Sequence, residues 1–363
     1  MKNTYGNNLT LTLFGESHGK AIGAVLDGIA AGIAVDEAFI NSQLSKRRAA
    51  DEISTARKEA DEVKILSGVF NGHTTGTPIC FVIENNDTKS KDYSDTYGKA
   101  RPGHADYTAF VKYGGNEDFR GGGHFSGRIT APIVAAGALV ISALRNKGIY
   151  IGTHIKECAG VPDRAFSDLY ADVTAVNEKS FAVLDENKGE KMRENILKAK
   201  EEGDSVGGIL ETAVIGIPAG AGEPWFDSVE SMLSHGLFSI PAVKGVEFGA
   251  GFAFADMKGS EANDSFVAND RNITTVTNNN GGINGGITNG MPILFSCVVK
   301  PTPSIVKPQQ TVDFIKGENV TLSVKGRHDP CIVHRARVVV DSIAALTLAD
   351  LLVGRYGTDY LKD

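Results

Sequence analysis

The feature that most constrains the fold is the longest apolar run of the sequence, which covers residues 131–144 and contains no charged side chain. A helix needs about 20 apolar residues to cross a bilayer, so this run is too short to span a membrane. It predicts a helix buried inside the protein, because a helix that is apolar on every side has to be covered. Thr130 and Pro132 are typical of its start, and Gly148 of its end.

Among the other predicted elements, strands outnumber helices. Helices are predicted over 36–48, 186–202, 227–235 and 341–356, with Asp36 and Asp227 as capping residues and Asp341 at the start of the last one. Strands are predicted over 9–14, 63–70, 77–83, 150–156, 208–217, 291–299 and 321–324. Because strands and helices do not alternate strictly, the pattern predicts an α+β or mixed α/β fold and not a doubly wound parallel sheet. No linker or break in composition marks a domain boundary.

Composition limits the partners and the compartment. The 363 residues carry a formal net charge of −7 and a pI near 5.7. Nucleic acid and anionic membranes are therefore not expected as partners, and an anionic ligand needs local basic clusters. Four cysteines stand far apart without a C-x-x-C pair, which predicts neither a disulfide framework nor a zinc knuckle. Reduced thiols and a polar start without a signal peptide's apolar core favour a cytoplasmic protein.

Glycine-rich polar loops carry the residues that could do chemistry. The chain has 42 glycines, well above average usage of about 7%. The predicted loops over 85–118, 119–128, 278–290 and 325–337 hold most of the His, Arg and Asp of interest. Loops of this length in a compact fold are usually functional or disordered, and this mixture favours function.

The first such motif is Gly15-Glu16-Ser17-His18-Gly19, which matches the G-x-S-x-G nucleophile elbow of serine hydrolases. The context argues against that interpretation. Only sixteen residues precede Ser17, which leaves no room for an earlier oxyanion loop, and glycines at 23, 28 and 32 interrupt the stretch that should be a helix. His18 is therefore the side chain of greater interest.

Three further motifs combine imidazole, guanidinium and glycine. They are Arg101-Pro102-Gly103-His104-Ala105-Asp106, the segment 120–128 (RGGGHFSGR), and Gly326-Arg327-His328-Asp329-Pro330. Glycine-freed backbone amides beside such cations suit phosphate binding. Each motif also has a plain alternative: an imidazole bonded to Asp106, a flexible surface loop, and a solvated charged turn. Arg47, at the end of the first predicted helix, could simply complement the helix dipole.

Two ligand classes compete at this stage. A metal-assisted phosphoester hydrolase could draw its ligands from Glu16, His18, His104, Asp106, His124, His328 and Asp329. No pair of these has the i, i+4 spacing of helical ligands, and the neighbouring arginines would repel a cation. An anion-binding pocket explains the Arg and His residues more economically, and no metal site is predicted. No G-x-G-x-x-G supports a Rossmann nucleotide site.

The motifs in this order resemble the chorismate synthase family. The resemblance rests on GESHG (15–19), RPGHADY (101–107) followed by RGGG (120–123), SIPAVKGVEFG (239–249), GGINGGITNG (281–290), KPTPS (300–304) and GRHDPC (326–331). These segments span nearly the whole chain, and their order is far more specific than any one of them.

The resemblance implies a reaction, a fold and partners. The reaction is the 1,4-anti elimination of phosphate from 5-enolpyruvylshikimate 3-phosphate to give chorismate, with reduced FMN, in the last common step of aromatic amino acid biosynthesis. The implied fold is a single large domain over 1–363, with a helical layer between β-sheets, assembled as a homotetramer. No added reductase domain is visible, so reduced flavin is expected from an external flavin reductase, with NADPH only as an indirect electron source.

The resemblance also implies roles for individual residues. His18 is expected to protonate the departing phosphate, His104 to protonate reduced flavin near N1, and Asp329 to assist flavin N5 in removing the hydrogen. Arg47, Arg101 and Arg327 are expected to bind substrate anions, with Arg47 also a contact for NADP. The expected flavin contacts are His124, Phe125, Ser126, Pro241, Ala242, Gly285, Lys300, Pro301, Thr302, Pro303, Ser304 and Arg327.

The sequence departs from the family pattern at two places. After the triple glycine the family usually has Arg-Ser-Ser-Ala-Arg-Glu, whereas here His124 and Phe125 replace the first two residues. A flavin contact from the backbone can survive this change, but one from the missing arginine side chain cannot. After Arg47 the family often has Pro-Gly and another substrate arginine, which is missing here, and Arg57 is a candidate substitute.

Overall fold

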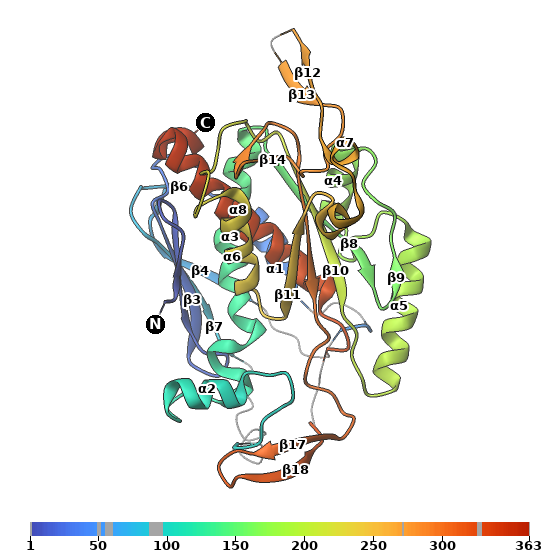
Figure 1. Ribbon diagram of the computed structural model, residues 1–363. Helices are drawn as coiled ribbons and strands as arrows, with labels where there is room; N and C mark the ends of the chain where they lie inside the picture. Colours follow the sequence, from blue (N-terminus) through green and yellow to red (C-terminus); the bar gives the residue numbers. More distant parts are fainter. Residues whose placement is uncertain are drawn as a thin grey trace.

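Two antiparallel sheets enclose a layer of helices (Figure 1). The structure, a computed structural model, describes residues 2–48, 52–54, 61–86, 97–270, 272–324 and 329–362. The first sheet has the order β1-β2-β3-β7-β4, formed by Thr4–Tyr5, Thr10–Gly15, Ala21–Asp27, Ile79–Glu84 and Val63–Ser67. The second has the order β11-β16-β10-β8-β9, formed by Val243–Phe248, Ile293–Val299, Gly208–Ile215, Tyr150–Cys158 and Val161–Pro162. The predicted α+β class is confirmed.

The helical layer is built around α3 (Thr130–Asn146) and α8 (Val333–Tyr356), with α1 (Glu37–Arg47) and α6 (Val229–Ser239) beside them. Residues 130–141 of α3 are all buried, as the apolar run predicts. The span Gly127–Asn146 is long and apolar enough to cross a membrane, but 89% of its apolar stretch lies inside the fold, as in the core helix of a globular domain. A Cβ on Gly137 would lie 2.3 Å from Ser342 Cβ, so glycine permits the close approach of α3 and α8.

The remaining elements lie around this sandwich. The further helices are α2 (Asp106–Tyr113), α4 (Leu169–Glu178), α5 (Glu186–Glu201) and α7 (Gly259–Ala262). Short 3-10 turns occur at Arg120–Phe125, Gly127–Ile129, Gly251–Asp256 and Thr358–Leu361. Four hairpins complete the fold: β5–β6 (Val69–Phe70, His73–Thr74), β12–β13 (Phe266–Asn269, Asn272–Thr275), β14–β15 (Ile283–Asn284, Ile287–Thr288) and β17–β18 (Gln309–Asp313, Glu318–Leu322). In Figure 1, β12–β13 and β17–β18 project at opposite ends of the molecule.

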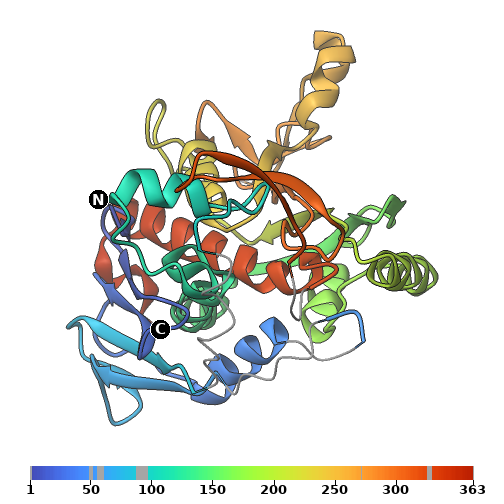
Figure 2. The same cartoon turned by 90° about the horizontal axis from the view of Figure 1, so that it is seen from below.

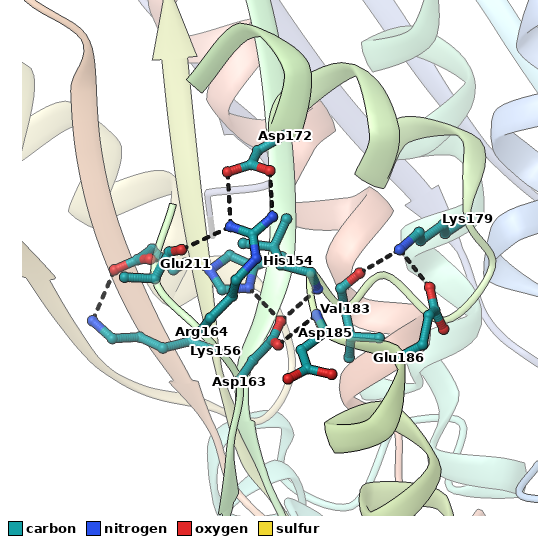
Figure 3. Close-up of polar contacts among 12 residues, drawn as sticks. His154, Lys156, Asp163, Arg164, Asp172, Lys179, Val183, Asp185, Glu186 and Glu211 are labelled. Carbon is teal, nitrogen blue, oxygen red and sulfur yellow. Dashed lines mark hydrogen bonds and ion pairs between the residues drawn. The ribbon is translucent and has the colours of Figure 1, made fainter. Parts of the chain in front are cut away.

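A cluster of polar side chains connects strand β8 of the second sheet to the residues just before α5 (Figure 3). His154, on β8, is fully buried, and its two ring nitrogens lie 3.1 Å from Asp163 Oδ2 and 3.0 Å from Glu211 Oε2. Asp163 also accepts hydrogen bonds from the backbone N–H groups of Leu184 and Asp185. Burial lowers the pKa of His154, but the hydrogen bonds that its ring donates to the Asp163 and Glu211 carboxylates outweigh burial and raise the pKa above its ordinary value.

Most element predictions are confirmed, and two helix starts are wrong. The last helix begins at Val333 and not at Asp341, so the predicted loop over 325–337 is helical from Val333 onward. Asp341 lies buried inside α8, where it accepts a hydrogen bond from Thr153 Oγ1 (2.6 Å) and faces Arg337. Helix α6 is capped by Ser228, whose hydroxyl accepts from the Ser231 N–H, and not by Asp227.

Four of the longer elements were not predicted. The segment Ala21–Asp27 is strand β3, although its glycine had only argued against a helix. Helix α2 lies within the predicted loop over 85–118, and α4 and β11 fall in stretches given no element. Length does not explain these misses, since β3 has 7 residues and α4 has 10 residues with Asp168 as its N-cap.

Candidate functional site

The predicted site motifs RPGHAD, SIPAV and KPTPS meet near α2 and the β17–β18 hairpin. This is the lower end in Figure 1 and the face toward the viewer in Figure 2. Strand β16 ends at Val299, and Lys300 follows it. The Lys300 N–H donates to Ala242 O (2.9 Å), and its ammonium donates to Gly103 O (2.5 Å). Arg101 Nη1 lies 3.4 Å from Ser304 Oγ. The KPTPS, SIPAV and RPGHAD motifs are thus in direct contact.

The triple glycine forms a tight turn that packs against the His18 ring. Gly121, Gly122 and Gly123 all have positive φ, and the Ser17 N–H donates to Gly123 O (3.1 Å). A Cβ on Gly121 would lie only 2.1 Å from His18 Cε1, so the turn can approach the imidazole this closely only without a side chain. His18 is buried, with 7% of its surface exposed.

Hydrogen bonds set the orientation of the His18 ring. Ser17 Oγ donates to Arg120 O (3.2 Å), so its lone pairs are left to accept from His18 Nδ1, which is 3.2 Å away. This arrangement favours a proton on Nδ1 and directs Nε2 away from the serine. Ser17 is therefore a partner of His18 and not a nucleophile activated by it.

His104 lies on the other side of the same turn. A Cβ on Gly122 would be 3.4 Å from His104 Cε1 and Nε2, so the two imidazoles flank adjacent glycines. His104 Nδ1 is 2.8 Å from Asp106 Oδ1, and Arg101 donates to both Asp106 oxygens through Nε (2.9 Å) and Nη2 (2.7 Å). The predicted alternative of an imidazole bonded to Asp106 is thus confirmed as a contact, and it does not exclude a role in catalysis.

The Asp106 carboxylate is held charged by this arrangement. Burial raises the pKa of Asp106, but the hydrogen bonds from His104 and Arg101 outweigh it and keep the pKa well below its ordinary value. A cavity opens beside these three residues. Its lining residues are Tyr97, Gly98, Lys99, Arg101, His104, Ala105, Asp106, Ala109, Glu117, Asp118, Phe119, Gly122, Phe125 and Phe314. Aromatic rings and charged groups face the same space, which suits a flat, charged ligand.

Asp329 lies just before α8 and contacts both the KPTPS segment and the first turn of that helix. Its carbonyl accepts from Thr302 Oγ1 (2.7 Å), and its carboxylate pairs with Arg335 Nη1 (2.7 Å). Arg335 Nε also donates to Arg47 O (2.7 Å), which connects Asp329 to the end of α1. Asp329 is therefore placed beside the KPTPS segment, and its role toward flavin stays a prediction.

The Arg47 guanidinium is bonded to protein groups. It donates to Asp61 Oδ2 (3.0 Å), Thr130 Oγ1 (2.9 Å) and Gly127 O (2.9 Å), and Arg128 pairs with the other oxygen of Asp61. Contact of Arg47 with substrate or NADP stays a prediction, because its side chain is buried and bonded to these partners.

Other predicted contacts are dispersed or fall outside the described residues. Gly285 lies in the β14–β15 turn, which Figure 1 places at the end of the molecule away from α2. The His124 ring has Gly15 O as a partner, 2.7 Å from Nδ1. Arg57, Arg327 and His328 lie outside the described residues. Their roles, and that of Gly285, stay predictions.

Sequence reasoning missed the residues that hold the assigned ones in place. Arg335 pairs with Asp329, and Asp61 joins Arg47 to Arg128. Arg335 could have been found had the helix been started at Val333, since it then falls in the first turn. Asp61 could not have been found, because nothing in the sequence around it predicts a buried carboxylate.

The candidate metal ligands do not form a cluster in the described part of the chain. No group of three or more His, Cys, Asp or Glu side chains there is arranged to hold a metal ion. His104 and Asp106 are instead bonded to each other and to Arg101, whose charge disfavours a cation. The geometry gives the metal-assisted hydrolase no support among these residues.

Comparisons with known proteins agree with this fold and site. The protein-family model described as chorismate synthase matches residues 9–353. Chorismate synthases of Thermococcus kodakarensis and Pyrococcus abyssi are 45% and 48% identical over 350 residues, which cover 96% of this chain and 97% of each relative. The chain is 29% identical to a crystal structure of chorismate synthase, with a TM-score of 0.76 over 97% of this chain and 94% of that one.

The sandwich of sheets around buried helices, with imidazoles and guanidiniums gathered at one end, defines an α+β enzyme built to bind anions. The chain belongs to the chorismate synthase family. It is therefore an enzyme of aromatic amino acid biosynthesis whose substrate is 5-enolpyruvylshikimate 3-phosphate.

Proposed function

We propose that the chain is a lyase that eliminates phosphate from 5-enolpyruvylshikimate 3-phosphate in a 1,4-anti reaction and requires reduced FMN. The observation that carries this proposal is the contact of His18 and His104 with adjacent glycines of one turn. Two titratable rings from segments far apart in sequence thereby lie beside one turn, and Arg101 and Lys300 contact Ser304 and Gly103 nearby. The substrate bears two carboxylates and a phosphate, which such cations recognise.

The residues present fit a flat, phosphorylated cofactor. The cavity beside Arg101, His104 and Asp106 is lined by the aromatic rings of Phe119, Phe125 and Phe314, so charged and flat apolar groups share one space. The segments 124–126, 241–242 and 300–304 would hold the flavin, with Arg327 and Gly285 as further contacts. When bound, reduced FMN supplies electron density as phosphate departs and recovers it as the hydrogen leaves.

His18 acts as the general acid for the leaving phosphate. With a proton on Nδ1 directed at Ser17, Nε2 is the atom that carries the transferred proton when the ring is protonated. The Gly121 contact fixes the ring. A positioned acid of this kind contributes on the order of 10²- to 10⁴-fold to the rate.

His104 would hold a proton near flavin N1, and Asp329 would assist flavin N5 in removing the hydrogen. The Arg335 ion pair keeps the Asp329 carboxylate oriented. Arg101, Arg47 and Arg327 bind the substrate anions. Fixed charges in a water-poor cleft stabilise the charge that develops as phosphate leaves.

The assembly is a homotetramer in the cytoplasm, supplied with reduced flavin by a separate reductase. Trp225, Phe226 and Phe252 support an assembly, since 79%, 92% and 84% of their surfaces are exposed. Large apolar groups this exposed mark interaction surfaces. NADPH serves only as an indirect source of electrons.

One anaerobic assay tests the proposal. The protein is mixed with chemically reduced FMN and 5-enolpyruvylshikimate 3-phosphate, and chorismate and phosphate are followed together. Equal amounts of both products, formed only with reduced flavin, support the lyase. Phosphate released without flavin, and suppressed by a chelator, would instead support the metal-assisted hydrolase, and binding without turnover would contradict both enzymes.

A further inference from the structure

We propose that Asp106 is a positioning residue that fixes the tautomer of His104 and the orientation of Arg101. The inference rests on the proposed function, in which these two side chains contact flavin and substrate. Asp106 belongs to the first turn of α2, and its carboxylate accepts hydrogen bonds from both.

The contact with His104 determines which ring nitrogen faces the site. A charged carboxylate only accepts hydrogen bonds, so His104 Nδ1 must carry a proton to bond to Asp106 Oδ1 at 2.8 Å. In the neutral ring, Nε2 is then a free acceptor, and it lies on the side of Gly122. His104 can therefore take up and give back a proton at Nε2 without turning.

The Asp106 carboxylate also fixes the orientation of the Arg101 guanidinium. The Arg101 backbone N–H and Nε both donate to Oδ2 at 2.9 Å, and Nη2 donates to Oδ1 at 2.7 Å. These bonds use one edge of the guanidinium. Nη1 remains on the other side, where Ser304 Oγ is 3.4 Å away and a substrate anion can bind.

A purely structural role is the competing explanation, and the chain contains a matched example of it. Asp172 also lies in the first turn of a helix, α4. It pairs with both terminal nitrogens of Arg164 and accepts from the backbone N–H of Ser167. Figure 3 shows this pair between α4 and the chain after β9, beside the second sheet and among residues outside the site. Within the described part of the chain, the Asp172 carboxylate bonds to Arg164 and Ser167 and to no histidine. Asp172→Asn therefore removes an Arg–carboxylate pair without affecting a histidine tautomer.

The test compares Asp106→Asn, Asp106→Glu and Asp172→Asn with the wild type. In the protein without flavin, ¹⁵N NMR of the His104 ring should show Nδ1–H in wild type, Asp106→Glu and Asp172→Asn. In Asp106→Asn, the Nδ1–H population should fall, because an amide accepts more weakly and cannot satisfy both Arg101 and His104. This measurement does not depend on activity, so it stays informative if the proposed reaction is wrong.

Kinetics supply the second measurement. We expect kcat to fall roughly 10- to 100-fold in Asp106→Asn, KM to rise because Arg101 is released, and Asp106→Glu to recover part of kcat. Asp172→Asn should change neither constant. Should Asp106→Asn fail to fold, the same two measurements are made on Asp106→Ala, which also removes the acceptor of the Nδ1–H group. An unchanged tautomer in Asp106→Asn, or a loss of kcat no greater than in Asp172→Asn, overturns the proposal.

Discussion

Replacing Gly121 by alanine tests the contact between the glycine turn and His18. The new Cβ would lie 2.1 Å from His18 Cε1 and 2.3 Å from Nδ1, where ordinary contacts are no shorter than 3.4 Å. The ring therefore has to retreat by about 1.3 Å, or the turn has to open. Neither movement preserves the hydrogen bond to Ser17.

Two effects with different magnitudes follow. Gly121 has a φ of 60°, and an L-residue in this left-handed conformation costs about 1–2 kcal/mol of stability. Displacement of a catalytic group by about 1 Å costs on the order of 10²-fold in rate. Gly121→Ala should thus remain folded under assay conditions but lose about 10²-fold in kcat.

The assay is anaerobic chorismate formation at saturating substrate and reduced FMN, alongside urea unfolding. Gly127→Ala is the matched control from the same loop, because its Cβ would meet nothing within 4 Å and its φ is not positive. The control should keep both its rate and its stability. A Gly121→Ala enzyme that turns over like the wild type would refute the reasoning about His18.

Three further predictions concern single groups. His18→Ala should lower kcat about 10²- to 10⁴-fold and leave flavin affinity, measured by fluorescence titration, unchanged; an unaltered rate contradicts its role as acid. Asp329→Asn retains the shape but removes the charge, so single-turnover chorismate formation should become much slower, and normal turnover contradicts the assignment. Because Asp163 and Glu211 raise the pKa of His154 in the folded state, their stabilisation is complete below about pH 6.5 and is lost as the pH rises through the folded pKa. The difference in unfolding free energy between wild type and His154→Asn should therefore shrink from pH 6 to pH 9, and a constant difference contradicts the pairing.

Local signals were sufficient for the strongest elements of the fold. Asp36 caps α1 by accepting from the Phe39 N–H, as its position predicts, and the apolar run forms the buried helix α3. The start of α8 could not be predicted, because residues 333–340 include four valines, which are weak helix formers. Burial against α3 and β8 overrides that preference.

The sequence motifs located the candidate site, but they did not show which of its residues contact one another. Glycine next to histidine indicated close approach, but the partner of Gly121 is His18, about a hundred positions earlier. Buried carboxylates such as Asp61 and Asp341 gain their partners only through tertiary contacts. A sequence lists ionisable residues but does not show which of them lie next to each other.

The central claim is that His18, His104 and Asp329 surround one bound flavin and substrate. The most direct measurement is a crystal structure of the enzyme with FMN and 5-enolpyruvylshikimate 3-phosphate. The account predicts the phosphate beside His18 and the flavin ring between His104 and Asp329. Ligands bound elsewhere, or these three side chains directed into separate spaces, would contradict it.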